Sequence, residues 1–383
     1  MKHDAPSLVD LPAADRPTAA LIDLEALDHN FREAAHRAGG RQVLAVVKAG
    51  AYGHGAVEIS RRLLGLGADM LGVALVEEGS ELREAGIETP ILVMGALFPD
   101  QAETVVSLRL TPTVFTLAGA RALSEAAVKL RMKVAAHVKI DTGMGRIGIA
   151  PEEAPRLIGE MRRLEGVEVR GLMTHFADAD LCDKQFASQQ MERFEKLLKT
   201  LDADGISVPV RHAANSAAVL DFPRALFTMV RPGLMLYGYN PLEKGATARA
   251  GLRPVLSLVT RIAFLKKVPA GIPISYGRTF VTRRESIIAT LPIGYADGYN
   301  RGLSNKAEVL VRGVRASVVG RVCMDMCMID VTDVPGVAEG DDVVLIGSQA
   351  NERITADEIA AKTGTIAYEV LCGISSRVPR LYH

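Results

Sequence analysis

Eight short apolar runs alternate with amphipathic segments along the N-terminal part of the chain, and this alternation constrains the fold most strongly. The apolar runs are 43–47, 71–74, 91–94, 111–115, 134–140, 167–173, 208–212 and 227–230. The segments with helical spacing are 57–66, 76–85, 101–108, 117–130, 151–164 and 184–201. Strands that alternate with helices imply parallel strands joined by helical crossovers, and eight such units are typical of a (β/α)8 barrel. We therefore predict an α/β fold in which residues 17–250 form a TIM-like barrel.

An open, doubly wound sheet is the alternative to the barrel. No G-x-G-x-x-G follows a predicted strand, which disfavours the dinucleotide-binding form of that fold. A short strand over 19–21 and a helix over 24–38 precede the first repeat, and residues 1–16 are expected to form a flexible tail.

Beyond residue 250 the pattern changes to short alternating runs rich in Val, Ile and Thr, separated by Gly and Pro. These runs are 256–264, 287–291, 308–311, 317–320, 326–331 and 342–346. One helix is expected over 355–363, where Thr355 and Glu358 have the spacing of a capping box. Residues 251–383 are therefore predicted to form a mainly β C-terminal domain.

Charge and cysteine content exclude several classes of protein. Basic and acidic residues are equal in number, 45 each, so no excess of positive charge points to nucleic acid. No apolar run is long enough to span a bilayer or to serve as the core of a signal peptide, so we expect a cytoplasmic protein with no membrane partner. The four cysteines include no C-x-x-C pair, which favours buried thiols over a zinc site or a disulfide framework.

Chemically reactive side chains follow the predicted strands instead of being scattered. Those positions are Lys48, Tyr52, Arg146, His175, His212, Asn215, Ser216, Arg231 and Gly233. In a (β/α)8 barrel all strand ends of this kind lie on the C-terminal face, where active sites are built. We therefore predict one shared site.

Lys48 ends a buried strand and is followed by Gly50, Gly53 and Gly55. Burial favours the neutral amine, which reacts with an aldehyde to form a Schiff base. Ser216 and the backbone at Gly233 follow strands seven and eight, where barrels commonly bind phosphate. The structural alternatives are a lysine that only marks a strand end and a serine that only caps a helix.

Four histidines near strands, His54, His137, His175 and His212, raise the alternative of a metal barrel. No H-x-H or H-E-x-x-H spacing occurs, so no metal is expected. These histidines and Arg231 also have structural interpretations, as near-core hydrogen-bonding groups and as a surface ion pair.

The predicted β domain has its own tyrosines in glycine-rich turns. Tyr276 lies in ISYGRTF and Tyr295 in LPIGYADGYNR, while Met324 and Tyr368 lie in similar polar interruptions. An arginine beside a tyrosine lowers the phenol pKa and makes the phenolate a usable base. Exposed hairpin tips are the structural alternative.

Several long motifs resemble, in order, those of the alanine racemase family, whose members bind pyridoxal phosphate in a barrel of this type. The motifs are AVVKAGAYGHG, HVKIDTGMGRIG, HAANSAA, VRPGLMLYG, ISYGRTF, LPIGYADGYNR, GRVCMDM, AYEV and SSRVPR. The resemblance extends from about residue 17 to the C-terminus. It implies a homodimer with shared active sites that interconverts L-alanine and D-alanine and supplies D-alanine for peptidoglycan.

The resemblance also implies a role for each matching residue. Lys48 holds the pyridoxal phosphate and is one catalytic base, and the partner's Tyr276 is the other. Arg231 binds the pyridine nitrogen and is steadied by His212, while His175 bonds Tyr276. The remaining cofactor-binding positions are Tyr52, Asn215, Ser216, Gly233, Leu234 and Tyr368.

Substrate contacts and access are implied in the same way. Arg146 contacts the cofactor oxygen and, with the backbone amide of the partner's Met324, the substrate carboxylate. Lys139 matches a lysine that is carbamylated in many relatives, where it positions the arginine equivalent to Arg146. The substrate corridor is formed by Tyr295, Arg301 and Asp180.

Three other functions are alternatives to an alanine racemase. A racemase of broader specificity is the nearest alternative, although such relatives usually carry an export signal, which is not found here. A decarboxylase would need a carboxylate in place of Arg231. A non-catalytic pyridoxal-phosphate carrier would lack the β domain.

Overall fold

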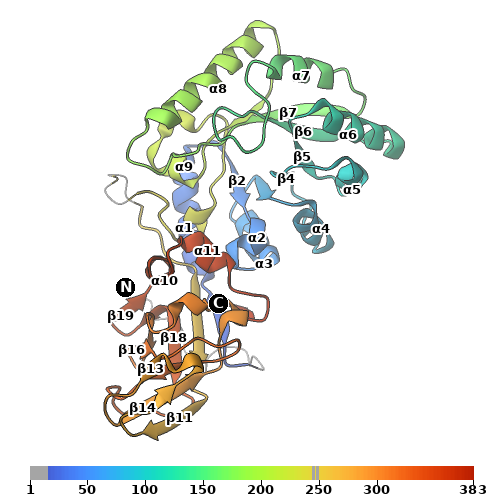
Figure 1. The fold of residues 1–383 in the computed structure, drawn as a ribbon. Coiled ribbons are helices and arrows are strands. Elements are labelled where there is room, and N and C mark those ends of the chain that lie inside the picture. Colours follow the sequence, from blue (N-terminus) through green and yellow to red (C-terminus); the bar gives the residue numbers. More distant parts are fainter. Residues whose placement is uncertain (1–15, 244–245, 247–249) are drawn as a thin grey trace. The chain divides into compact units, whose positions relative to one another are not determined.

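The computed structural model describes residues 16–243, 246 and 250–383, which divide into two compact units (Figure 1). The barrel unit comprises residues 27–51 and 56–253, and the β unit comprises residues up to 26 together with 52–55 and 254–383. Of the predicted flexible tail, residues 1–15 lie outside the described residues. Arg16 is described and makes hydrogen bonds within the β unit.

Eight parallel strands form the barrel unit, in the spatial order β8-β7-β6-β5-β4-β3-β2-β9. Their bounds are β2 (Gln42–Val46), β3 (Met70–Val73), β4 (Ile91–Val93), β5 (Thr111–Val114), β6 (Val134–Lys139), β7 (Val167–Met173), β8 (Val210–His212) and β9 (Met229–Val230). Hydrogen bonds from Thr228 N to Arg211 O (3.1 Å) and from Arg231 N to Ala214 O (2.9 Å) bridge the two end strands. The predicted barrel is therefore confirmed as a nearly closed ring.

One helix precedes the first of these strands and helices follow most of them (Figure 1). They are α1 (Leu24–Ala38), α2 (Lys48–Tyr52), α3 (Ala56–Gly65), α4 (Val76–Glu84), α5 (Ala102–Ser107), α6 (Leu117–Leu130), α7 (Ala154–Met161), α8 (Gln185–Ala203) and α9 (Ser216–Asp221). The apolar spacing predicted all but α2 and α9. Helix α6 has the predicted bounds and begins where Thr116 accepts a hydrogen bond from Gly119 N. Helix α7 begins later than predicted, because the proline in its first turn is Pro155 and residues 151–153 form a turn.

The β unit is built on one ten-stranded, mainly antiparallel sheet, in the order β11-β14-β17-β16-β15-β18-β10-β1-β20, with β19 beside β18. The bounds are β1 (Ala19–Ile22), β10 (Leu256–Arg261), β11 (Phe264–Val268), β14 (Ser286–Leu291), β15 (Glu308–Val311), β16 (Val314–Val318), β17 (Cys327–Asp330), β18 (Asp342–Gln349), β19 (Glu352–Ile354) and β20 (Arg380–Tyr382). A small hairpin adds β12 (Pro273–Ile274) and β13 (Phe280–Val281). This confirms the prediction that the C-terminal domain is mainly β.

Strand β1 belongs to the β unit and not to the barrel, where the sequence had placed residues 17–26. Ala20 is in register with Leu258 of β10 and Arg380 of β20. All four residues of β1 are buried, so side chains on both faces of this strand are covered. An apolar strand signal identifies such a segment but not the sheet that it joins.

Two short helices and several turns complete the β unit. Helix α10 (Ala356–Thr363) has the predicted cap, since Thr355 Oγ1 accepts a hydrogen bond from Glu358 N. Helix α11 (Ala367–Cys372) was not predicted. The cysteine prediction is correct for Cys327, which is buried, and wrong for Cys182 and Cys372, which are exposed.

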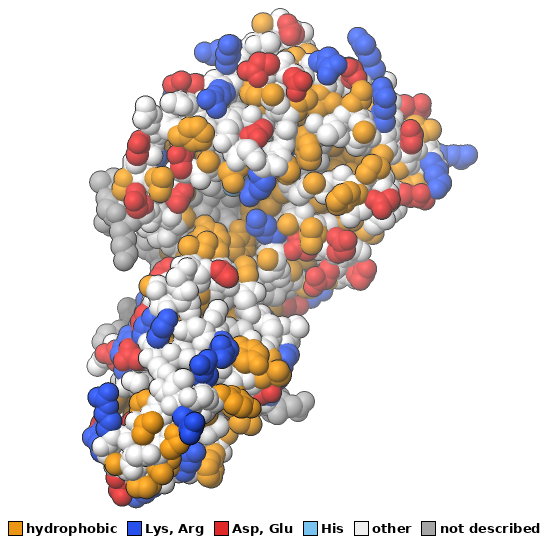
Figure 2. All heavy atoms as spheres, in the orientation of Figure 1, with side chains coloured by type: hydrophobic (Ala, Val, Ile, Leu, Met, Phe, Trp, Pro, Cys, Tyr) orange, Lys and Arg blue, Asp and Glu red, His pale blue; other side chains and the backbone are white. Residues whose placement is uncertain are grey.

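Basic and acidic side chains are intermingled over the barrel unit on the face shown in Figure 2. None of the helices in the described ranges is long and apolar enough to cross a membrane.

Gly171 of β7 leaves the space that the His137 ring of β6 occupies. A Cβ atom at residue 171 would lie 2.5 Å from that ring. We expect Gly171→Ala to lower the free energy of unfolding by about 1–3 kcal/mol through overpacking, measured by thermal or urea denaturation. Gly159→Ala is the matched control, because residue 159 lies in α7 with no heavy atom within 4 Å of the added Cβ. The control should gain about 0.5–1 kcal/mol. Equal stability of the two variants would contradict the prediction.

Candidate active site

Polar side chains gather where the barrel strands end. Lys139 and His212 are the last residues of β6 and β8, and Arg231 directly follows β9. Lys48 and His175 come two residues after β2 and β7. Because the strands are parallel and the ring is nearly closed, these residues lie at the same end of the barrel.

Arg231 is the centre of a buried hydrogen-bond cluster. Its Nη1 lies 3.0 Å from His212 Nδ1, and its Nη2 donates to Thr174 O (2.8 Å) and Ala213 O (2.9 Å). A further contact of 3.3 Å joins Nη2 to His175 Nδ1. Burial lowers the pKa of Arg231 to about 10, so the guanidinium remains charged at neutral pH.

The arginine determines where the protons of the neighbouring imidazoles lie. A guanidinium only donates, so His212 Nδ1 is an acceptor and the His212 proton is on Nε2. His212 Nε2 lies 2.9 Å from His137 Nδ1, which therefore accepts that proton's hydrogen bond. Burial, followed by the charge of Arg231, lowers the pKa of His212 well below its usual value and that of His137 to about 4. Both rings are neutral at pH 7.

The tautomer of His175 is fixed by Arg231 in the same way. Its Nδ1 accepts from Arg231, so its proton is on Nε2 and is available to a further acceptor. Burial and then the charge of Arg231 lower the pKa of His175 well below its usual value.

Lys139 is a buried amine beside two cations. It is 2% exposed, and its Nζ donates to Ile140 O at 3.3 Å. Burial, and after it the charge of Arg231, lower its pKa to about 7; Arg146 adds to this and Asp141 opposes it. Arg146 itself is exposed in a turn in which the Asp141 carboxylate accepts from Gly143 N (3.0 Å) and Gly145 N (3.1 Å).

Ser216 joins the start of α9 to the loop after β9. Its Oγ accepts from Gly233 N (2.8 Å) and Met235 N (3.3 Å). A hydroxyl has two acceptor positions and one donor, so the O–H of Ser216 remains to donate to an anion. Asn215 is the N-cap of α9, where its Oδ1 accepts from Ala218 N (3.0 Å), and Leu234 opens the buried turn η4 (Leu234–Tyr237).

A left-handed turn follows Lys48. Within α2, Ala49, Gly50 and Ala51 have φ values of 53°, 60° and 53°, and Tyr52 has φ 54°. Left-handed backbone costs about 1–2 kcal/mol for each residue with a side chain. Three residues with side chains, Ala49, Ala51 and Tyr52, share this turn with Gly50. Strain of this kind is concentrated at functional sites in proteins.

The other predicted site residues, apart from Asp180, lie in the β unit. The rings of Tyr52 and Tyr368 are 6.0 Å apart, and burial raises the pKa of Tyr52. Tyr276, Met324 and Tyr295 are exposed by 73%, 53% and 42% of their surface. Arg301 is exposed in η7 (Arg301–Leu303), and Asp180 is half-buried in the loop between β7 and α8 of the barrel unit.

His137 is the residue whose place in this cluster the sequence did not reveal. The sequence showed it only as one of four histidines near strands. Its position two residues before Lys139 puts both side chains on the same face of β6, and that was the one available signal.

Comparison with known proteins gives one consistent result. The family model for the alanine racemase N-terminal domain matches residues 22–241, and that for the C-terminal domain matches residues 255–382. The alanine racemase of Halothermothrix orenii is 48% identical over 96% of this chain and 97% of its own. A relative named alanine racemase 2, from Caldanaerobacter subterraneus, is 50% identical over 96% of this chain and 95% of its own.

Solved structures agree with the sequence relatives. An alanine racemase structure from Clostridium difficile matches with a TM-score of 0.93 and 40% identity, covering 97% of each chain. One from Bacillus anthracis, with bound L-Ala-P, has a TM-score of 0.90 and 37% identity over 97% of this chain and 96% of its own. The sequence and the fold are thus shared with these relatives over nearly the whole length of the chain, and the chain belongs to the alanine racemase family.

Proposed function

We propose that this protein interconverts L-alanine and D-alanine with pyridoxal phosphate as cofactor. The observation that carries the proposal is the strand-end cluster, in which a buried, permanently charged arginine and two neutral histidines lie at the end of the barrel that also bears Lys48. The names of the relatives support alanine as the substrate.

The donors of the barrel unit fit this cofactor. The Ser216 O–H is available to a phosphate, and Lys48 supplies a primary amine for the aldehyde. The four hydrogen bonds of Arg231 in the described part of the chain use only Nη1 and Nη2, which leaves its Nε–H to donate to a ring nitrogen. When bound, pyridoxal phosphate withdraws the electron pair that proton removal leaves on the substrate α-carbon.

Two bases on opposite sides of the α-carbon carry out the racemisation. Lys48 removes or returns a proton on one side, and Tyr276 of the partner subunit does so on the other. His175 donates its Nε2–H to the Tyr276 oxygen and thereby favours the phenolate. Arg231 only donates hydrogen bonds and cannot accept one from a protonated ring nitrogen, so the ring nitrogen of the bound cofactor would stay unprotonated and weak as an electron acceptor. With a weak electron acceptor, the two bases control where the proton returns, and transamination is disfavoured.

The remaining assignments follow from membership of the family. Tyr52 and Tyr368 bind the phosphate with Ser216 and Leu234. The Gly233 amide donates a hydrogen bond to Ser216 Oγ in this structure, so it acts on the phosphate through the Ser216 side chain. Arg146 and the partner's Met324 bind the substrate carboxylate, and Tyr295, Arg301 and Asp180 line the corridor. The exposure of Tyr276, Met324 and Tyr295 supports a homodimer in which these side chains are covered.

In the cell, the protein would act in the cytoplasm and supply D-alanine for peptidoglycan. The alternative is a racemase of the same fold with broader substrate specificity. Comparing alanine with serine, lysine and arginine as substrates separates the two functions.

The first prediction is that the purified protein, with pyridoxal phosphate, converts L-alanine into D-alanine, followed by chiral chromatography. Lys48→Ala should lose activity by at least about 10²–10⁴-fold, the contribution of a general acid–base group. Borohydride reduction of the holoprotein and peptide mapping should attach the cofactor to Lys48. Lys184, whose Nζ is held by Ala179 O and Leu181 O, is an internal control. Release of carbon dioxide, no turnover, or cofactor on another lysine would each refute the assignment.

The second prediction concerns the second base. Tyr276→Phe should slow exchange of the α-hydrogen with solvent for one enantiomer by about 10²–10⁴-fold, while Lys48 still exchanges that of the other. Proton NMR in deuterium oxide measures both rates. Tyr295→Phe removes the hydroxyl of a corridor residue and should keep exchange with both enantiomers. Equal loss for both enantiomers in Tyr276→Phe would rule out the two-base mechanism.

The third prediction is that Lys139 is carbamylated in a pH-dependent way. Only a neutral amine reacts with carbon dioxide, and with a pKa of about 7 this amine becomes largely neutral as the pH rises from 6 to 8. The carbamate anion would be stabilised by the two cations that disfavour the ammonium, Arg231 and Arg146. Carbon NMR in labelled bicarbonate should show a bound carbamate that increases over this pH range and is missing in Lys139→Gln. A signal that survives in the variant would contradict the assignment.

A further inference from the structure

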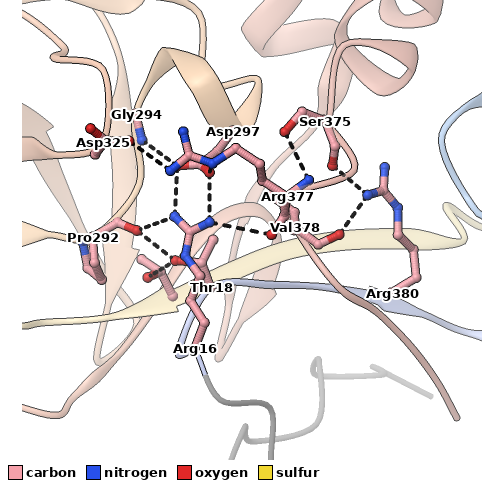
Figure 3. A network of polar contacts seen from close by, with 11 residues as sticks. Arg16, Thr18, Pro292, Gly294, Asp297, Asp325, Ser375, Arg377, Val378 and Arg380 are labelled. Carbon is pink, nitrogen blue, oxygen red and sulfur yellow. Dashed lines mark hydrogen bonds and ion pairs between the residues drawn. The ribbon is translucent and has the colours of Figure 1, made fainter.

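A buried carboxylate in the β unit is held by an arginine that belongs to none of the motifs of the proposed site (Figure 3). Asp297 is fully buried, and both of its oxygens accept hydrogen bonds from Arg16, Oδ1 from Nη1 (2.7 Å) and Oδ2 from Nη2 (2.8 Å). Arg16 Nη2 also donates to Pro292 O at 2.8 Å. Two parallel hydrogen bonds of this kind strengthen an arginine–carboxylate pair and fix its orientation.

Asp297 closes a turn that carries a proposed corridor residue. It is the last residue of η6 (Tyr295–Asp297), and its Oδ2 also accepts from Gly294 N at 3.0 Å. With Pro292 held by the same guanidinium, Arg16 spans the base of the turn over residues 292–298, which we call the Tyr295 turn. Tyr295 projects from this turn with 42% of its surface exposed.

The Tyr295 turn is joined directly to the segment that carries Met324. Tyr295 N donates to Cys323 O and Ala296 N donates to Met324 O, both at 3.0 Å. A Cβ on Gly294 would lie 2.3 Å from Met324 O, so the two backbones touch without room for a side chain. We call residues 320–326 the Met324 loop.

A second arginine closes the network from the other side. Arg377 Nη2 donates to Asp325 Oδ1 of the Met324 loop at 2.7 Å, and its Nε lies 3.5 Å from Asp297 Oδ1. Figure 3 shows both guanidinium groups directed at the Asp297 carboxylate. Two cations and two anions thus balance, with Asp297 as the buried member. Burial alone would raise the pKa of Asp297, but the bonds from Arg16 and Gly294 hold it below its usual value.

We infer that Arg16 is a positioning residue that fixes the Tyr295 turn and the Met324 loop and so sets the affinity for the substrate. This inference rests on the proposed function, in which Met324 binds the substrate carboxylate and Tyr295 lines the corridor. Arg16 touches neither substrate nor cofactor. It acts on binding and not on the proton transfers of Lys48 and Tyr276.

The kinetic test compares Arg16→Ala and Arg16→Lys with the wild-type holoenzyme. We expect KM for alanine to rise about tenfold in Arg16→Ala with kcat within about twofold, the pattern of lost binding that is uniform along the reaction. Because the enantiomers have equal free energies, kcat/KM must fall equally in both directions, which checks the measurement. Arg16→Lys keeps the charge but not the paired geometry and should give an intermediate KM.

Arg284→Ala is the matched control. It removes an exposed ion pair with Asp333 in the same unit and should leave KM unchanged. Cofactor content and thermal melting separate a folding defect from a change in affinity. If Arg16→Ala does not fold, the comparison of Arg16→Lys with Arg16→Gln replaces it, with the lower KM expected for lysine. Wild-type KM in the Arg16 variants, with or without a lower melting temperature, overturns the inference.

Hydrogen exchange measured by mass spectrometry tests the tether without any catalysis. Peptides covering the Tyr295 turn and the Met324 loop should exchange about tenfold faster in Arg16→Ala, while β15 should not change. Unchanged protection in both segments overturns the inference. A wild-type protein that does not racemise alanine would refute the proposed function instead, and the exchange comparison would still decide whether Arg16 holds the two segments.

Discussion

A permanent cation held among uncharged acceptors is the constraint on which the barrel unit depends. The four hydrogen bonds of Arg231 go to two carbonyls and two imidazoles, and no carboxylate takes part in them. Leaving a buried charge without partners is far more costly than leaving a neutral group unpaired, so a barrel that buries Arg231 must also supply these acceptors. The strand ends are thus organised by one side chain, and the same charge keeps the neighbouring rings neutral and Lys139 close to neutrality.

The barrel end is therefore an electrostatic unit as much as a geometric one. Its histidines form a directional chain in which each ring has one defined tautomer, because the first proton position is imposed by a donor that cannot change. In the β unit the organising charge is negative instead of positive. There a buried carboxylate, Asp297, organises the loops around it with arginines as its partners. In each unit a buried charge thus makes hydrogen bonds that orient exposed or reactive side chains nearby.

The sequence predicted the barrel well because its signals are local. Apolar runs and helical spacing located all eight strands, and polar residues at the ends of those runs located His212 and Arg231 at the strand ends. Lys139 was identified only through the family resemblance. Three features were beyond such signals. An alternating or apolar strand pattern does not identify the strands that a segment pairs with, so β1 was assigned to the barrel. Left-handed φ at Ala49, Ala51 and Tyr52 opposes the preference of each residue and requires the tertiary structure to impose it. His137 lies in an apolar strand, and only the pairing of β6 and β8 with β7 brings its ring to His212.

Strand β1 also determines the order in which the chain can complete its folding. It lies between β10 and β20, so its two partners are synthesised after the entire barrel, and the second comes from the last residues of the chain. During translation the barrel can assemble from contacts between neighbouring segments, while β1 has neither neighbour yet. An apolar strand with both edges open is prone to wrong pairing. During synthesis one edge of β1 therefore stays unpaired until β10 has been made, and the other stays unpaired until β20 has been made. The interval between barrel formation and the completion of this sheet is thus the vulnerable stage of biosynthesis.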